Sequence, residues 1–230
     1  MAIPDVLYLA FIAIGLPLDH FVLWPAFVRR SQADPGRARA FLWSSWMILL
    51  WALAAAGMAV WVFEARAWAA LRLQPPHGWR LWVASALVLG FTVGYARTVI
   101  RIARRTRPTR VKMGRPDVER LVPRGRSELR SWIALSVSAG FCEEFIFRGY
   151  LIRALQPVFG LWGAAAVSLV VFAAAHAYQG AIGVLATGAI GAALTLVVLV
   201  FGSLLPAMAL HAVIDIGEGL VGYLVLGEGR

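Results

Sequence analysis

The chain has 230 residues, of which 60% are hydrophobic and 15% are charged, and its formal net charge at pH 7 is +10. Soluble domains have roughly 45–50% apolar and about 25% charged residues, so this composition excludes an ordinary soluble domain and predicts a membrane protein. Cys142 is the one cysteine, which excludes an intrachain disulfide framework and a zinc site built from thiolates.

Apolar runs occur along the whole chain at the length, about 20 residues, that crosses a hydrocarbon layer about 30 Å thick. Because lipid offers no partners to free backbone groups, such runs without the alternation of a barrel predict helices. The first run follows Met1 without a basic segment or a small-residue cleavage site, so we expect a retained helix. We predict an all-α, polytopic transmembrane helical bundle of about seven spans, near residues 6–28, 41–63, 81–100, 132–155, 158–177, 182–201 and 204–226.

Asp19 and His20 lie late in the first run, two residues after Pro17. They are close to an expected membrane surface, where an ionised group is less costly than at the bilayer centre. This position favours a solvated pair, and a contribution to a buried polar cavity is the alternative.

Positive charge is concentrated in two connections between the runs. Residues 97–130 contain 12 Lys or Arg against three carboxylates, and the connection after the first run contains Arg29, Arg30, Arg37 and Arg39 against Asp34. Two runs separate these connections, so both lie on one side of the membrane, which the positive-inside rule predicts to be cytoplasmic. We expect contact with anionic lipid headgroups and no binding of nucleic acid. The short chain, rich in Arg and Ala, indicates a bacterial inner membrane.

The basic connection also divides the chain, because its three prolines and two glycines disfavour a long helix. The front part is rich in Trp, and the rear part concentrates Glu, His, Arg and Asp inside apolar helices. We predict an N-terminal three-span region (1–100), a basic cytoplasmic loop (101–130) and a four-span catalytic core (131–230).

The fourth run carries Glu143, Glu144 and Arg148 within six residues of apolar sequence. An ionised side chain near the bilayer centre costs roughly 2.5–3.5 kcal/mol, so each of these needs a compensating role. Glu144 and Arg148 are four residues apart and share one helix face, which predicts a structural ion pair. Glu143 is rotated by about 100° from that face and is left as a free base.

Two later runs add His176, at the end of the fifth, and His211 with Asp215 in the last. The spacing of four residues lets Asp215 orient the His211 imidazole. A water held between Glu143 and a histidine can lose a proton and attack a carbonyl carbon, while the second histidine stabilises the oxyanion. This pattern favours hydrolysis of an amide within the membrane.

The three segments, Glu143-Glu144-Phe-Ile-Phe-Arg148, Phe172-Ala-Ala-Ala-His176 and His211-Ala-Val-Ile-Asp215, occur in this order. Together they resemble the EExxxR, FxxxH and HxxxN/D motifs of the CAAX protease and bacteriocin-processing (Abi) family of intramembrane proteases, which includes the type II CAAX prenyl endopeptidases. The resemblance covers residues 131–216. It implies that Glu143 and His176 activate water, that His211 belongs to the oxyanion site and that Arg148 with Glu144 holds the helix. We expect Phe172 to be a packing residue.

Asp215 departs from the asparagine that is commoner at the last position of these motifs. An asparagine amide can donate a hydrogen bond to an oxyanion, whereas an ionised aspartate cannot. Asp215 is therefore expected either to orient His211 or to stay protonated through burial.

These observations predict an intramembrane endopeptidase that acts on a membrane-embedded or membrane-anchored peptide without a cofactor. A zinc-dependent metalloprotease, with Glu143, His176 and His211 as ligands, is the alternative within enzymes, although the chain has no HExxH motif. A proton-coupled transporter and a non-catalytic immunity or scaffold protein are alternatives from other classes. Intramembrane Glu, His and Asp also form proton relays, but the paired broken helices of transporters are not found.

Overall fold

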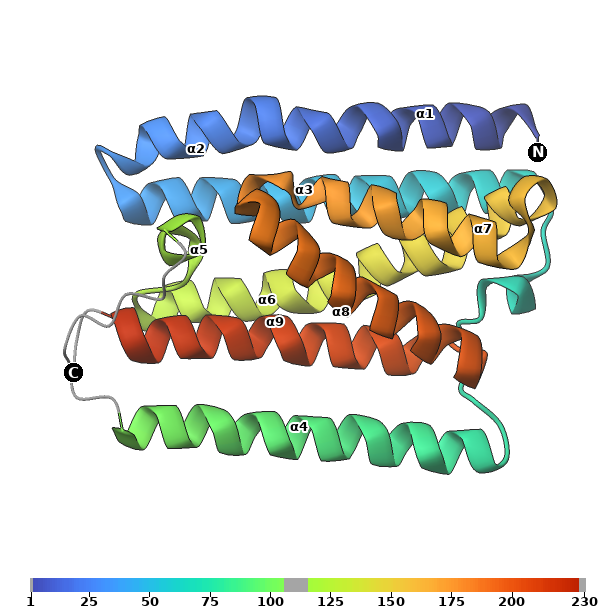
Figure 1. The fold of residues 1–230 in the computed structure, drawn as a ribbon. Coiled ribbons are helices and arrows are strands. Elements are labelled where there is room, and N and C mark those ends of the chain that lie inside the picture. The colour runs from blue at the N-terminus through green and yellow to red at the C-terminus, as the bar shows by residue number, and fades with distance from the viewer. Residues whose placement is uncertain (1, 106–115, 228–230) are drawn as a thin grey trace.

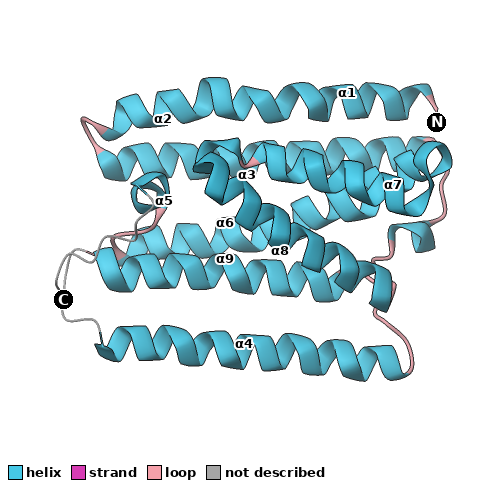
Figure 2. Cartoon of the chain, viewed as in Figure 1, coloured by secondary structure: helices cyan, strands magenta, loops and turns pink. Residues whose placement is uncertain are grey.

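Residues 2–105 and 116–227 are described in the computed structural model of the protein, and this part of the chain consists of helices joined by turns and short loops (Figure 2). The α-helices are α1 (Ile3–Leu18), α2 (Trp24–Ser31), α3 (Pro35–Phe63), α4 (Trp79–Arg105), α5 (Pro116–Leu121), α6 (Arg126–Glu143), α7 (Ile152–Ala175), α8 (Gly180–Phe201) and α9 (Leu205–Leu226). Two π-helical segments, Asp19–Leu23 and Glu144–Leu151, continue α1 into α2 and α6 into α7. The predicted all-α polytopic bundle is confirmed.

Six helical segments of the described residues are long and apolar enough to cross a membrane: Ile3–Ser31, Pro35–Phe63, Trp79–Arg104, Arg126–Ala175, Ala177–Phe201 and Leu205–Leu226. The fourth contains two of the predicted runs, 132–155 and 158–177. As one straight helix, its 50 residues would measure about 75 Å, more than twice the hydrocarbon thickness. Its direction reverses at Gly160, where φ is 66° and ψ is 174°, and the rest of α7 returns beside the π-helical segment Glu144–Leu151 (Figure 1).

The outer faces of the bundle carry large apolar side chains. Ile3, Trp82 and Ile182 are each at least three-quarters exposed. A soluble protein rarely exposes so much contiguous apolar surface, whereas lipid tails are as apolar as these side chains. With six segments able to span a bilayer, the chain is an integral membrane protein.

The end of the molecule that carries the α2–α3 turn is fixed by local capping and by one long-range ion pair. Asp34 precedes α3 and accepts a hydrogen bond from the Arg37 backbone N–H at 2.9 Å, and Pro35 occupies the first helical position. Arg39 then donates from Nε and Nη2 to the Glu128 carboxylate at 3.2 and 2.8 Å, which ties the start of α3 to the start of α6.

The predicted basic loop 101–130 is only partly described, because residues 106–115 lie outside the described residues. Within it, α4 continues to Arg105, α5 forms a short helix and α6 begins at Arg126. The division into regions 1–100, 101–130 and 131–230 stays a prediction.

At the opposite end of the bundle, a buried carboxylate connects the first helix to the second π-helical segment. Asp5 accepts a hydrogen bond from the Tyr150 hydroxyl and another from Arg66 Nη2, both at 2.6 Å. The Tyr8 hydroxyl nearby donates to the Leu53 carbonyl at 2.9 Å. These bonds fasten α1 to α3 and to the segment that carries Glu144.

The centre of the bundle is the antiparallel pair α6 and α9, with α3 packed on α6, α4 packed on α9 and α8 crossing obliquely over them (Figure 1). Gly140 lies where the backbones of α6 and α9 approach each other closely. A Cβ atom there would be 2.9 Å from the Met208 carbonyl oxygen and 3.0 Å from the Ala212 backbone nitrogen. Backbone atoms cannot rotate away as a side chain can, so a glycine is needed at this contact.

We expect Gly140→Ala to lower the free energy of unfolding by about 1–3 kcal/mol, because α9 must move away from α6. Thermal unfolding of the purified protein in detergent measures this change. Gly94→Ala is the control, since nothing lies within 4 Å of a Cβ atom at Gly94 on α4. Equal unfolding temperatures for the two variants would contradict the close approach.

Candidate active site

A cavity of about 190 Å³ lies inside the bundle, and the polar residues singled out in the sequence meet at its wall. Glu143 from the end of α6, His176 from the end of α7, and His211 with Asp215 from α9 all line it. The four residues come from three helices separated by up to 72 positions, so the fold brings together the groups that the motifs predicted.

Glu144 does not line this cavity but lies behind it, fully buried at 0% exposure. Its Oε1 accepts a hydrogen bond from Arg148 Nη1 at 2.9 Å, so the predicted ion pair is present. The same oxygen is 2.8 Å from His211 Nδ1. Because an ionised carboxylate only accepts hydrogen bonds, Nδ1 of His211 carries the proton in this contact.

Arg148 connects the π-helical segment to α8. Its Nη2 donates to the Gly191 carbonyl at 3.0 Å, and its Nε donates to Thr195 Oγ1 at 3.3 Å. The guanidinium carbon lies 4.1 Å from the centre of the Phe172 ring. A Cβ atom at Gly191 would be 2.9 Å from Arg148 Nη2, so the absence of a side chain there makes room for the guanidinium.

Phe172 is 2% exposed and separates the two imidazoles of the site. Its ring centre lies 4.9 Å from that of His176 and 6.2 Å from that of His211. Its backbone carbonyl oxygen is 2.9 Å from His176 Nδ1. Since a carbonyl only accepts, His176 donates from Nδ1, and its Nε2 is left with a lone pair that can accept a proton.

The second nitrogen of His211, Nε2, faces two carboxylates. Glu143 Oε2 is 3.9 Å away and Asp215 Oδ2 is 3.6 Å away, both beyond a direct hydrogen bond but within reach of a bridging water. The sequence spacing allowed Asp215 to orient His211, as one of two alternatives. In the structure, His211 donates its hydrogen bond from Nδ1 to Glu144, which is more distant in the sequence.

Glu143 has no such partner within the part of the chain that the structure describes. Its side chain is 14% exposed, and its Oε2 is a buried oxygen without a hydrogen bond to those residues. Buried polar atoms are nearly always hydrogen-bonded in folded proteins, and exceptions cluster where chemistry or ligand binding occurs. Glu144 Oε2 is likewise buried without a hydrogen bond to the described residues, but Glu144 does not line the cavity. Glu143 is therefore the carboxylate of this pair that is available to a water or a substrate.

Asp19 is a further carboxylate of the cavity wall, and the expectation of a solvated pair with His20 is wrong for it. Asp19 is 7% exposed, and its Oδ1 accepts a hydrogen bond from Trp46 Nε1 at 2.5 Å. Like His176 and Glu143, it lines the cavity. The π-helical turn at Asp19 shifts the face of the helix on which this side chain lies, which a regular helical period does not predict.

Trp46 connects Asp19 to His176 through ring contacts with Tyr178. Its ring centre lies 5.3 Å from that of Tyr178, and the Tyr178 ring lies 6.0 Å from the His176 ring. The N-terminal spans, which the sequence motifs do not include, therefore contribute side chains to the site. The feature of the sequence that could have identified Asp19 as a site residue is a carboxylate inside an apolar run.

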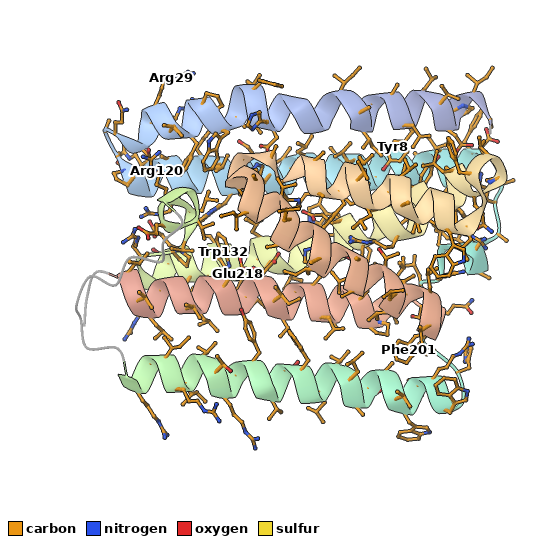
Figure 3. All side chains as sticks on the ribbon, viewed as in Figure 1. Tyr8, Arg29, Arg120, Trp132, Phe201 and Glu218 are labelled. Atoms are coloured by element: carbon orange, nitrogen blue, oxygen red, sulfur yellow. The ribbon has the colours of Figure 1, made fainter. Side chains whose placement is uncertain are left out.

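The cavity extends from the histidines toward the end of the bundle that carries the α2–α3 turn. Trp132 of α6, Glu218 of α9 and Leu121 of α5 line this extension. Trp132 and Glu218 lie near that end, beside α5 (Figure 3). Among the described residues that line the cavity there is no Lys or Arg, whereas Asp19, Glu143, Asp215 and Glu218 give it an acidic wall.

Glutamate and histidine side chains of this kind are also possible zinc ligands. Across residues 2–105 and 116–227, no group of three or more His, Cys, Asp or Glu side chains is arranged so that it could hold a metal ion. Glu143, His176 and His211, the ligands considered for the zinc alternative, are therefore not grouped as a zinc site here. Independence from metals stays a prediction.

Comparison with known proteins agrees with this geometry. Residues 125–217 match the family model of the type II CAAX prenyl endopeptidase Rce1-like proteins, while no match was found among curated proteins or among solved structures. The matched segment contains every residue of the three motifs, and Asp19 lies outside it. Over this segment the chain is similar to the type II CAAX prenyl endopeptidases, which supports the resemblance to the CAAX protease and bacteriocin-processing family.

Proposed function

We propose that the protein is an intramembrane endopeptidase in which Glu143 and His176 activate a water that hydrolyses a peptide bond of a membrane-associated protein or peptide. The family is one of proteases, which supports hydrolysis of a peptide bond in general. The observation that carries the specific mechanism is the buried Oε2 of Glu143, which has no hydrogen bond within the described residues and faces the same cavity as His176 and His211.

In the proposed reaction, a water donates one hydrogen bond to the Glu143 carboxylate and one to His176 Nε2. Glu143 takes a proton as the water oxygen attacks the carbonyl carbon of the scissile bond. His211 donates from Nε2 to the developing oxyanion while Nδ1 keeps its bond to Glu144. Glu143 then returns that proton to the leaving nitrogen, and the C–N bond breaks. The products are a new carboxyl group and a new amine.

The imidazolium form of His211 is needed for this role, because both of its ring nitrogens must donate. Three carboxylates surround it: Glu144 at 2.8 Å, Asp215 at 3.6 Å and Glu143 at 3.9 Å. In this scheme Asp215 contributes charge near Nε2, while Glu144 supplies the orienting hydrogen bond.

We assign Asp19 a positioning role. Its bond to Trp46 holds the indole against Tyr178, and Tyr178 packs beside His176. The first two spans thereby form the wall opposite Glu143, and they fix the ring that must accept a hydrogen bond from the water.

The substrate enters, in this proposal, from the membrane surface at which the basic connections lie, because the cavity extends to α5 at that end. A membrane-embedded or membrane-anchored peptide reaches such a cavity from the bilayer. The excess of Lys and Arg in these connections supports a cytoplasmic orientation in a bacterial inner membrane.

Replacing Glu143 separates catalysis from folding. We expect Glu143→Gln to reduce processing at least about 100-fold, since it removes the general base, while expression and unfolding temperature remain near those of the wild type. Proteomics of membrane fractions detects the result as one uncut precursor that accumulates. Glu64→Gln, a carboxylate outside the cavity, is the control. Normal processing by Glu143→Gln would refute the mechanism.

Replacing the neighbouring carboxylate has a different outcome. Glu144→Gln leaves the buried Arg148 charge without its ionic partner and replaces the ionised acceptor of His211 Nδ1 with a neutral amide oxygen. Breaking a buried ion pair costs about 3–5 kcal/mol, so the unfolding temperature in detergent should fall sharply. If Glu144→Gln unfolds at the temperature of the wild type, Glu144 does not have the structural role described above.

The role of Asp19 is tested through Trp46. We expect Asp19→Asn and Trp46→Phe each to slow precursor processing about tenfold, and the double variant to be little slower than either, because both remove one interaction. Rates are measured by pulse-chase in membranes, and unfolding temperature is followed in parallel. Multiplicative losses in the double variant would show that the two residues act independently.

Metal dependence is tested by chelation. Dialysis of the purified protein against a zinc chelator should leave the processing rate unchanged, since the proposed base is a carboxylate that acts on free water. Elemental analysis of the active preparation should find less than stoichiometric zinc. Loss of activity that returns with added zinc would establish the metalloprotease alternative.

A further inference from the structure

A second cavity, of about 310 Å³, lies at the end of the bundle where α2 turns into α3. It is separate from the acidic cavity and differs from it in charge. The described residues that line it are Val28, Ser31, Gln32, Pro35, Arg39, Arg120 and Arg124, so three guanidinium groups face it and no Asp or Glu does.

The cavity is positioned at a membrane surface by the topology. The turn between α2 and α3 joins two segments that cross the bilayer, so it lies at the level of the lipid headgroups. Arg29, in the last turn of α2, and Arg120 of α5 lie at this same end of the molecule (Figure 3).

Two of the three guanidinium groups are held in place by hydrogen bonds. Arg39 donates to Glu128 from two nitrogens, at 3.2 and 2.8 Å. Arg124 donates from Nη1 to the Leu226 carbonyl at 3.0 Å and from Nη2 to the Glu119 carbonyl at 2.8 Å. The Arg124 backbone N–H adds a bond to Glu128 Oε2 at 2.7 Å. The wall is therefore ordered before any ligand binds, which reduces the entropy cost of binding.

Arg120 differs from the other two because it is exposed, and no described residue forms a hydrogen bond or ion pair with it. A guanidinium presents a planar fork of N–H donors that matches two oxygens of a phosphate group. Among the described residues, Glu128 is the carboxylate that accepts the hydrogen bonds given above from this set of arginines. Positive charge is thus in excess at the cavity.

We propose that this cavity binds the phosphate group of an anionic phospholipid headgroup. Basic pockets between transmembrane helices at the surface of a bilayer have the depth and charge for such groups. The phosphodiester would lie between Arg120 and Arg124, next to the polar side chain of Gln32. Free phosphate has the same chemistry, and the experiment separates the two sources.

The site also has a consequence for the acidic cavity, because α5 lies between the two. Arg120 lines the basic cavity, whereas Val118 and Leu121 of the same short helix line the acidic one. A headgroup bound at Arg120 would hold α5 in place at the opening of the acidic cavity. This consequence rests on the proposed function, whereas headgroup binding itself does not.

The test uses the full chain, purified in a neutral detergent, and native mass spectrometry with added phosphatidylglycerol or phosphatidylcholine. Wild type should retain phosphatidylglycerol and not phosphatidylcholine. Arg120→Gln should lower the bound fraction about fivefold. Arg37→Gln, whose side chain is 92% exposed at the same end and does not line the cavity, should bind as the wild type does.

Inorganic phosphate is then added as a competitor. Displacement of the lipid would assign the site to the phosphate group alone, and retention would assign it to the whole headgroup with its acyl chains. Equal retention of both lipids by wild type, or equal losses in Arg120→Gln and Arg37→Gln, would overturn the proposal. Arg120 is exposed, so its replacement should not impair folding, and an unchanged unfolding temperature verifies this.

Discussion

The architecture of the site depends on one buried carboxylate, Glu144, whose Oε1 accepts hydrogen bonds from both Arg148 and His211. Through these two partners it joins the π-helical segment to α8, by way of Gly191 and Thr195, and to α9. Burying ions is costly unless they are paired, so loss of any one member leaves a charge without compensation. Because Glu144 satisfies Arg148 and orients His211, the adjacent Glu143 is left facing the cavity. Glu144 thus has the structural role, and the adjacent Glu143 has the proposed chemical role.

The N-terminal spans are more than a hydrophobic enclosure for this pair. Asp19 and Trp46 come from α1–α2 and α3, outside the segment that matches the family, yet they line the acidic cavity. At the end of the bundle that carries the α2–α3 turn, α5 lies between this cavity and the basic one. Contacts between packed helices therefore connect the groups proposed for hydrolysis to the opening of the cavity. They also connect the opening to the membrane surface.

Much of this arrangement could be predicted from the sequence, and the exceptions have physical causes. Runs of apolar residues predicted the spanning helices because lipid leaves the backbone no other partner. The Glu144–Arg148 pair was predictable because four residues of a helix bring the side chains together. The bond between Glu144 and His211 joins residues 67 positions apart and depends on how α6 packs on α9. Asp19 was assigned to solvent because it lies near the expected membrane surface, and the sequence does not show the packing against α3 that places it beside Trp46.

The central claim is that Glu143, and not Glu144, is the carboxylate available to water. An experimental structure of the protein in lipid nanodiscs, at a resolution that shows ordered waters, tests this most directly. We predict a water within hydrogen-bonding distance of Glu143 Oε2 and His176 Nε2, with Glu144 bound to Arg148 and His211. A Glu143 side chain paired with Arg148, or turned away from His176 and His211 toward lipid, would contradict the account.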